Sequence, residues 1–277
     1  MLGLIIMGLW AAALPNATVI QPVANLYSKP SLDADVVSQA LYSANVAIIE
    51  ERDGWAHVRA FDDYTGWAPL TAVRKRESYA ATGRVAKVVS LFVNIYREPD
   101  ATRHAPVITV PFETRLEIVS DPAADARWLQ ARLPGGQTAW IQRGDVSFEN
   151  KPLSTAETVE FAKRFLGLPY TWGGTSAFGY DCSGFTQMLN RQRGVFMPRD
   201  AQPQADWSRV APVDRKDVRP GDLVFFGSSP KHITHTGMYI GGGKFINATS
   251  YQTPVVRIDD LDDPHFAQIL VAIRRVK

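Results

Sequence analysis

The chain has 277 residues, 45% of them apolar and 21% charged, which excludes wholesale disorder and indicates about two globular domains. Thirty Lys and Arg against 28 Asp and Glu leave a formal charge of +2, and the longest basic run is Arg74-Lys75-Arg76, so nucleic acid is not expected as a partner. The single cysteine excludes an intrachain disulfide and zinc sites built on several cysteines.

Residues 1–15 form a distinct segment, because Leu2–Leu14 is almost continuously apolar. The run is too short to cross a membrane as a helix, which needs about 20 residues, and Ala11–Ala13 resembles a signal cleavage site. No Lys or Arg precedes it, so we expect either an export signal or an apolar N-terminal arm. A signal predicts a periplasmic or secreted protein of the cell envelope, whereas an arm predicts a cytoplasmic one. After any cleavage we expect no stable membrane insertion.

An internal repeat follows, in which Asn25–Pro30 recurs as Asn94–Pro99, 69 positions later. In both copies two tryptophans stand 12 positions apart: Trp55 and Trp67, then Trp128 and Trp140. Short runs of Val, Ile and aromatic residues alternate with Gly-containing turns, which predicts two small all-β barrels at 16–76 and 81–150. Both units resemble bacterial SH3 (SH3b) domains. The alternative for the second tryptophan of each copy is that it serves only as barrel core.

The chain changes character after residue 150. Ser154 and Glu157 form a predicted capping box for a helix that ends by Gly167, and a second helix is predicted from about Cys182 to Arg193. Short strands then follow, with Gly241–Gly243 as a hairpin turn: 223–226, 236–240, 244–248, 255–258 and 269–273. Helices followed by an antiparallel sheet predict an α+β domain over residues 155–277.

Cys182 is the candidate nucleophile. It falls in the first turn of the second predicted helix, where free amide groups and the helix dipole favour the thiolate. The alternative is a small buried apolar residue. His235 opens a predicted strand whereas His232 lies in the preceding predicted loop, so His235 is better positioned to act as the base.

Asn247 is the candidate third member of this group. A turn centred on Gly242 would pair position 235 with 249 and position 237 with 247, so residues 235 and 247 would project from one face of the hairpin. The Asn carbonyl can then accept the imidazole N–H, as in papain-like enzymes. The alternative is a turn residue at the end of a strand.

A specific family resemblance covers residues 155–277. The motifs that carry it occur in the family's order: Leu168–Gly174, Asp181–Phe185, Pro198-Arg199, Gln204, Pro220–Phe226 and His235–Gly241. They resemble the NlpC/P60 cysteine peptidases, which implies that Cys182 is the nucleophile, His235 the base and Asn247 the third polar residue, where most members have His. The fold implied is multidomain: two SH3-like barrels followed by an α+β papain-like domain.

The same resemblance implies further site residues. Tyr170 would direct its hydroxyl at the developing oxyanion, with a packed loop tyrosine as the alternative. The implied substrate-binding residues are Asp181, Ser183, Tyr64 and Trp172. Asp181 would help to hold the free amine of an N-terminal L-Ala, or would simply cap the helix. Tyr64 from the first SH3b unit would close that end of the cleft, although Val37 stands where an accompanying glutamate is expected.

The leading hypothesis is a cysteine endopeptidase that hydrolyses the γ-D-glutamyl–diamino acid bond of murein peptides with a free N-terminal L-Ala. Two alternatives remain: a wall-binding protein with an inactive papain-like domain, and a thiol amidase or acyltransferase acting on another substrate. The expected partners are murein peptides or peptidoglycan. No metal or cofactor is expected, because His232 and His235 lack a carboxylate partner at ligand spacing.

Overall fold

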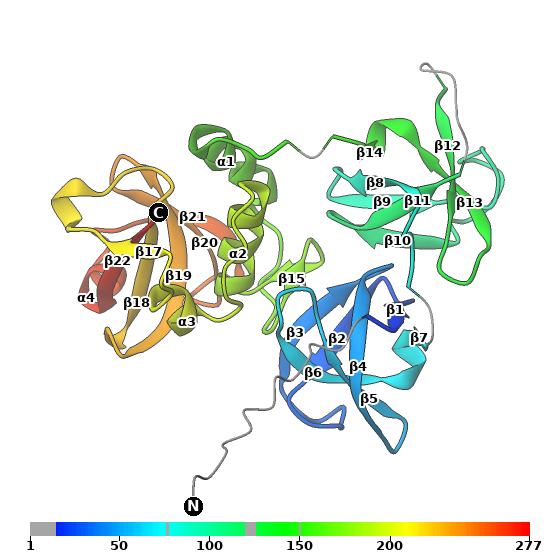
Figure 1. Cartoon of the computed structure of the whole chain (residues 1–277). Helices are drawn as coiled ribbons and strands as arrows, with labels where there is room; N and C mark the ends of the chain where they lie inside the picture. Colours follow the sequence, from blue (N-terminus) through cyan, green and yellow to red (C-terminus); the bar gives the residue numbers. More distant parts are fainter. Residues whose placement is uncertain (1–14, 76–77, 120–125, 150) are drawn as a thin grey trace, which may run out of the picture.

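The computed structural model describes residues 15–75, 78–119, 126–149 and 151–277 (Figure 1). The predicted signal or arm therefore lies almost entirely outside the described residues. Three groups of elements follow one another, each with its own apolar core. Within the described part of the chain, no helix is long and apolar enough to cross a membrane.

The first group is a sheet of the order β3-β2-β6-β5-β4-β1-β7. Its strands are β1 (Ala17–Val19), β2 (Val23–Tyr27), β3 (Val36–Leu41), β4 (Asn45–Arg52), β5 (Trp55–Arg59), β6 (Thr65–Pro69) and β7 (Val73–Lys75), with the 3-10 turn η1 (Leu70–Ala72) before the last. Asp53 and Gly54 both have positive φ, +48° and +83°, which forms the predicted tight turn between β4 and β5.

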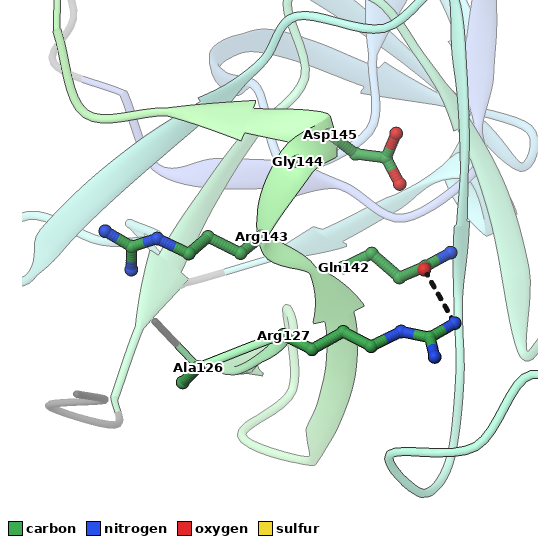
Figure 2. A pocket seen from close by; sticks show the side chains of 6 residues that line it. All are labelled: Ala126, Arg127, Gln142, Arg143, Gly144 and Asp145. Atoms are coloured by element: carbon green, nitrogen blue, oxygen red, sulfur yellow. Dashed lines mark hydrogen bonds between the residues drawn. The ribbon is translucent and has the colours of Figure 1, made fainter. Parts of the chain in front are cut away.

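The second group contains two sheets, β13-β12-β11-β8-β14 and β10-β9. Its elements are β8 (Arg84–Val88), β9 (Phe92–Ile95), β10 (Ile108–Pro111), β11 (Arg115–Ile118), β12 (Trp128–Arg132), β13 (Thr138–Gln142), the 3-10 turn η2 (Arg143–Asp145) and β14 (Val146–Ser147). A shallow cavity of about 490 Å³ lies beside η2, where Arg127 donates to Gln142 (Figure 2). None of the residues that line it belongs to the predicted site.

The internal repeat has a structural cause that the two groups share. Tyr27 pairs with Trp67 across β2 and β6, and its ring meets Trp55 edge-on at a centroid distance of 5.5 Å. Tyr96 likewise bridges to Trp140, and its ring meets Trp128 edge-on at 5.5 Å. Trp67 and Trp140 are only partly buried, so neither is purely a core residue. The repeat thus encodes one tyrosine that contacts the ring of the first tryptophan and pairs through the backbone with the second.

The third group places helices on both faces of an antiparallel sheet, β17-β22-β18-β19-β20-β21. The strands of the whole third group are β15 (Thr175–Ser176), β16 (Gly179–Tyr180), β17 (Val210–Pro212), β18 (Leu223–Ser229), β19 (His232–Gly241), β20 (Lys244–Thr249), β21 (Val255–Asp260) and β22 (Leu270–Val276). The helical elements are α1 (Thr155–Ala162), η3 (Lys163–Phe165), α2 (Cys182–Gln192), α3 (Ala201–Ala205), η4 (Arg215–Asp217) and α4 (Pro264–Ile269). Helix α2 packs on the face that carries Phe225 and Met238, while α4 covers Phe226 and Phe245.

The predicted helices, capping box and strands of this third group are confirmed, with one correction. His232 is the first residue of β19 and pairs with Ser229, so it does not lie in a loop. The short helices α3 and α4 were not predicted, because neither is long enough to show helical periodicity.

Side chains of helix α2 bond to both β groups. Arg191 makes a bidentate ion pair with Glu113 of the second group, with N–O distances of 2.9 and 2.5 Å. Gln187 donates to Asp62 of the first group at 2.9 Å. Since Cys182 begins the same helix, the β groups are fixed relative to the candidate nucleophile.

Candidate active site

Cys182 occupies the first turn of α2, as predicted. The N-cap residue Asp181 accepts a hydrogen bond from the Gly184 amide at 2.7 Å, and its own amide donates to the Gly174 carbonyl at 3.0 Å. A Cβ added at Gly184 would lie 2.2 Å from that carbonyl oxygen, so glycine is required for the close approach of loop and helix. The loop containing Gly174 and the turn containing Cys182 are thus one packed unit.

Cys182 is a buried residue, with 7% of its surface exposed. Burial, reinforced by the charge of Asp181, raises the pKa of Cys182 to about 12. Backbone amides of Thr236 and Ser183 act in the opposite direction without reversing the shift. The prediction that the helix N-terminus favours the thiolate was therefore wrong in net effect, because desolvation outweighs the amide groups.

His235 and Asn247 are brought together as predicted. Met238 lies opposite Ile246 and Tyr239 opposite Phe245, which is the register expected from a turn at Gly242. His235 Nε2 is 2.8 Å from Asn247 Oδ1. Cys182 lies beside the same strand, since the amide that acts on its sulfur belongs to Thr236, the neighbour of His235.

The imidazole sits in an apolar pocket whose ring neighbours are Phe226 and Phe266, at centroid distances of 5.6 and 6.2 Å. Burial lowers the pKa of His235 to about 4, against the raising effects of the Asn247 hydrogen bond and of the Asp259 charge. Burial therefore acts in the same sense on both groups: it favours the neutral thiol of Cys182 and the neutral imidazole of His235.

Asp259 was not predicted from the sequence. Its Oδ2 accepts from Asn247 Nδ2 at 3.0 Å and from Arg257 Nε at 2.9 Å. The hydrogen-bonded chain therefore runs from His235 through Asn247 to Asp259 and Arg257. The predicted strand ended at residue 258, and nothing in the sequence indicated that the next residue lies beside Asn247.

Tyr170 is partly buried, and Cys182 is among the groups that affect its ionisation. Burial is the main cause that raises the pKa of Tyr170, followed by the charges of Cys182 and Asp181. The backbone of Tyr170 is held by an amide hydrogen bond to the Pro254 carbonyl at 2.9 Å and by a bridge to Tyr180. Trp172 of the same loop is 67% exposed.

Both oxygens of the Asp181 carboxylate already accept hydrogen bonds within the protein. Arg199 donates to both of its oxygens, at 3.0 and 2.6 Å, and is itself 3% exposed. Ser183 accepts from Arg199 at 2.9 Å and donates to Asp181 at 3.3 Å. Arg199 is thus a buried ion-pair partner of Asp181, and it neutralises the charge that was expected to hold an ammonium group.

Tyr64 reaches the third group from the loop between β5 and β6. Its hydroxyl donates to Asp200 Oδ2 at 3.0 Å, and burial together with Asp200 raises the pKa of Tyr64 to about 12. Asp200 was not predicted as a site residue, although it follows Arg199 directly. Val37, which stands where an accompanying glutamate was expected, packs against the apolar core of its own β group.

A separate cavity of about 850 Å³ lies where both β groups meet α2. Its lining includes Asp62, Lys87, Glu113 and Arg191, and the eight predicted site residues are not among the described residues that line it. Within the described ranges, no three His, Cys, Asp or Glu side chains are grouped so that they could hold a metal ion.

Comparisons with known proteins identify the family of the chain. Residues 167–275 match the NlpC/P60 family, and residues 26–73 match the family described as bacterial dipeptidyl-peptidase Sh3 domain. The chain is 32% identical to a gamma-D-glutamyl-L-lysine dipeptidyl-peptidase of Bacillus cereus, over 86% of this chain and 74% of that protein. It is 28% identical to dipeptidyl-peptidase 6 of Lysinibacillus sphaericus, over 90% and 93% of the two chains.

A crystal structure of an NlpC/P60 family protein from Bacillus cereus superimposes with a TM-score of 0.81 at 25% identity, covering 94% of this chain and 99% of that one. The likeness therefore extends across the β groups as well as the α+β part. The chain therefore belongs to the NlpC/P60 family of cysteine peptidases, with a bacterial SH3 domain preceding its NlpC/P60 domain.

Proposed function

We propose that the protein is an endopeptidase that hydrolyses the γ-D-glutamyl–diamino acid bond of murein peptides whose N-terminal L-Ala is free. The observation that carries this proposal is the hydrogen bond from Tyr64 to Asp200, because it makes the first β group one wall of the site. The Bacillus cereus relative is named a gamma-D-glutamyl-L-lysine dipeptidyl-peptidase, which supports cleavage at the γ-D-glutamyl–diamino acid bond.

In the proposed mechanism, His235 takes the proton of the Cys182 thiol as the sulfur attacks the γ-carbonyl carbon of D-Glu. Both groups start neutral, so the transfer accompanies attack rather than preceding it. The Cys182 amide and the Tyr170 hydroxyl donate to the oxyanion. His235 then protonates the leaving amine, and water, activated by the same imidazole, hydrolyses the thioester.

The N-terminal ammonium group is assigned to Asp200 rather than to Asp181. Both oxygens of Asp181 are used by Arg199 and by the helix cap, whereas Asp200 accepts from the neutral Tyr64 hydroxyl. Asp181 and Ser183 fix Arg199 beneath this end of the site. The exposed ring of Trp172 is proposed to contact the substrate from the loop.

The proposed domain limits are 16–76 and 81–150 for two SH3-like barrels and 155–277 for the catalytic domain. The shared Tyr–Trp–Trp arrangement supports treating the two β groups as copies of one fold. A murein peptide substrate favours a periplasmic or secreted location in the cell envelope.

Product analysis by mass spectrometry tests the proposal. L-Ala-γ-D-Glu-L-Lys and its diaminopimelate counterpart should yield the dipeptide L-Ala-γ-D-Glu, whereas intact sacculi should release little. Release of fragments mainly from sacculi would instead indicate a wall-degrading enzyme. An intact soluble peptide combined with normal labelling of Cys182 by iodoacetamide would favour an acyltransferase or amidase with another substrate.

A further inference from the structure

The side-chain amide of Asn247 is held from both ends, and this inference rests on the proposed role of His235 as the base. Asn247 is fully buried, with Oδ1 at 2.8 Å from His235 Nε2 and Nδ2 at 3.0 Å from Asp259 Oδ2. The Arg257 carbonyl is a second acceptor for Nδ2, at 3.3 Å. In the described structure, both hydrogen-bond partners of Nδ2 are therefore oxygen atoms that can accept a hydrogen bond but cannot donate one.

The orientation of this amide decides which nitrogen of His235 carries the proton. An Asn side chain has nearly the same shape after a half-turn, so only its hydrogen-bond partners select the orientation. With Oδ1 toward the imidazole, Nε2 must donate and Nδ1 is left unprotonated as a base. With Nδ2 toward the imidazole, Nε2 must accept, and the proton moves to Nδ1, where it blocks removal of the thiol proton.

Asp259 removes this ambiguity. A carboxylate cannot donate, so a turned amide would place Oδ1 of Asn247 against Oδ2 of Asp259 and lose the hydrogen bond. Arg257 Nε holds the same Oδ2 at 2.9 Å, and the side chains of Arg257 and Asp259 are 20% and 15% exposed. We propose that Asp259 is a positioning residue, which acts through Asn247 to keep the Nδ1 nitrogen of His235 unprotonated and ready to accept the thiol proton.

The charge of Asp259 has a second effect on the base. The charged and titratable groups that act on His235 are Asp259 from β21, His265 from α4, and Asp181 at the start of α2, with Cys182 beside the strand. The two carboxylates raise the pKa of His235, whereas His265 lowers it. Removing the charge of Asp259 should therefore lower the pKa of His235 further and shift the acidic limb of kcat/KM to lower pH.

The test compares Asp259→Asn with Asp260→Asn in the full chain. Asp260 is the matched control, because it is adjacent, exposed and paired only with Lys244 in the described structure. Asp259→Asn should lower kcat by about tenfold or more with little change in KM, since the base is misoriented in part of the molecules. Asp260→Asn should behave like the parent enzyme.

The decisive readout is the ring-nitrogen NMR signal of His235, assigned by its loss in His235→Gln. The parent enzyme should show the Nε2–H form alone, and Asp259→Asn should show a mixture of both forms. An unchanged tautomer in Asp259→Asn would overturn the proposal, even if kcat falls. Because this readout needs no substrate, it remains valid if the bond assigned under the proposed function is wrong.

A swap of the two side chains provides rescue. In Asn247→Asp combined with Asp259→Asn, the carboxylate at 247 accepts from His235 in either orientation, and the amide at 259 donates to it. This double variant should recover most of the kcat lost in Asp259→Asn and return the Nε2–H form. A double variant as slow as Asp259→Asn, with both tautomers still present, would contradict the positioning role.

Discussion

The Tyr64 hydroxyl and the Asp200 carboxylate are 3.0 Å apart, although 136 positions separate them in the sequence. One comes from the first β group and the other from the start of α3, so the contact exists only when the two parts are packed together. It gives the candidate site a boundary that neither part has alone.

The first prediction concerns this boundary. Tyr64→Phe and Asp200→Asn should each lower kcat/KM on free-amine peptides by roughly 10–100-fold, because a hydrogen bond to a charged group contributes about 1.5–3 kcal/mol. Steady-state kinetics on paired free and N-acetylated peptides measure the effect. The acetylated peptides should be poor substrates of the parent enzyme and respond little to either change; equal parent activity on both would refute ammonium recognition.

Cys182→Ala should abolish turnover and leave the fold intact. The chain has no other cysteine, so iodoacetamide should label the parent protein once and the variant not at all. The free energy of unfolding should change by about 1 kcal/mol or less, since only one sulfur atom is removed. Circular dichroism and thermal melting check the fold. Loss of activity that always accompanies unfolding would support a purely structural cysteine.

The raised thiol pKa predicts an unusual pH dependence of alkylation. Thiolate is the reactive form, so a thiol with a pKa of about 12 should react with iodoacetamide about tenfold faster for each pH unit between 7 and 10. A preformed thiolate–imidazolium pair would instead give a rate that levels off below neutral pH. Stopped-flow or quenched labelling across this range separates the two cases, and a plateau would contradict the neutral resting pair.

How far the sequence could predict the site depends on how local each determinant is. The side of the hairpin shared by His235 and Asn247 follows from strand parity, and the cap at Asp181 follows from adjacent residues. Asp259 and Asp200 depend on packing between elements distant in the chain. The thiol pKa was mispredicted for the same reason: the helix N-terminus is a local feature, whereas burial depends on the whole fold.

In the fold, too, local features were predictable from the sequence and features that depend on packing between distant elements were not. The Asn25–Pro30 repeat and the spaced tryptophans predicted two β units, but not that Tyr27 and Tyr96 each contact the ring of one tryptophan and pair through the backbone with the other. Helices α3 and α4 have five and six residues, which is too few to show a helical period in the sequence. The sequence pattern therefore predicts loops at both places.

The anchoring of the second β group through α2 is also testable. Glu113→Gln should destabilise the protein by about 3 kcal/mol, because the largely buried Arg191 guanidinium loses its charged partner. Glu160→Gln, which removes an exposed pair with Lys163, should change stability by about 0.5 kcal/mol or less. Thermal or urea unfolding measures both. Equal effects of the two substitutions would show that the Glu113 contact does not hold the group in place.

The most direct test of the proposed activity is the intact mass of the protein after rapid acid quenching with L-Ala-γ-D-Glu-diaminopimelate. The account predicts an adduct with the mass of one L-alanyl-γ-D-glutamyl group on Cys182, absent from Cys182→Ala and from reactions with the N-acetylated peptide. An adduct that contains the diamino acid, or product formed by Cys182→Ala, would contradict it.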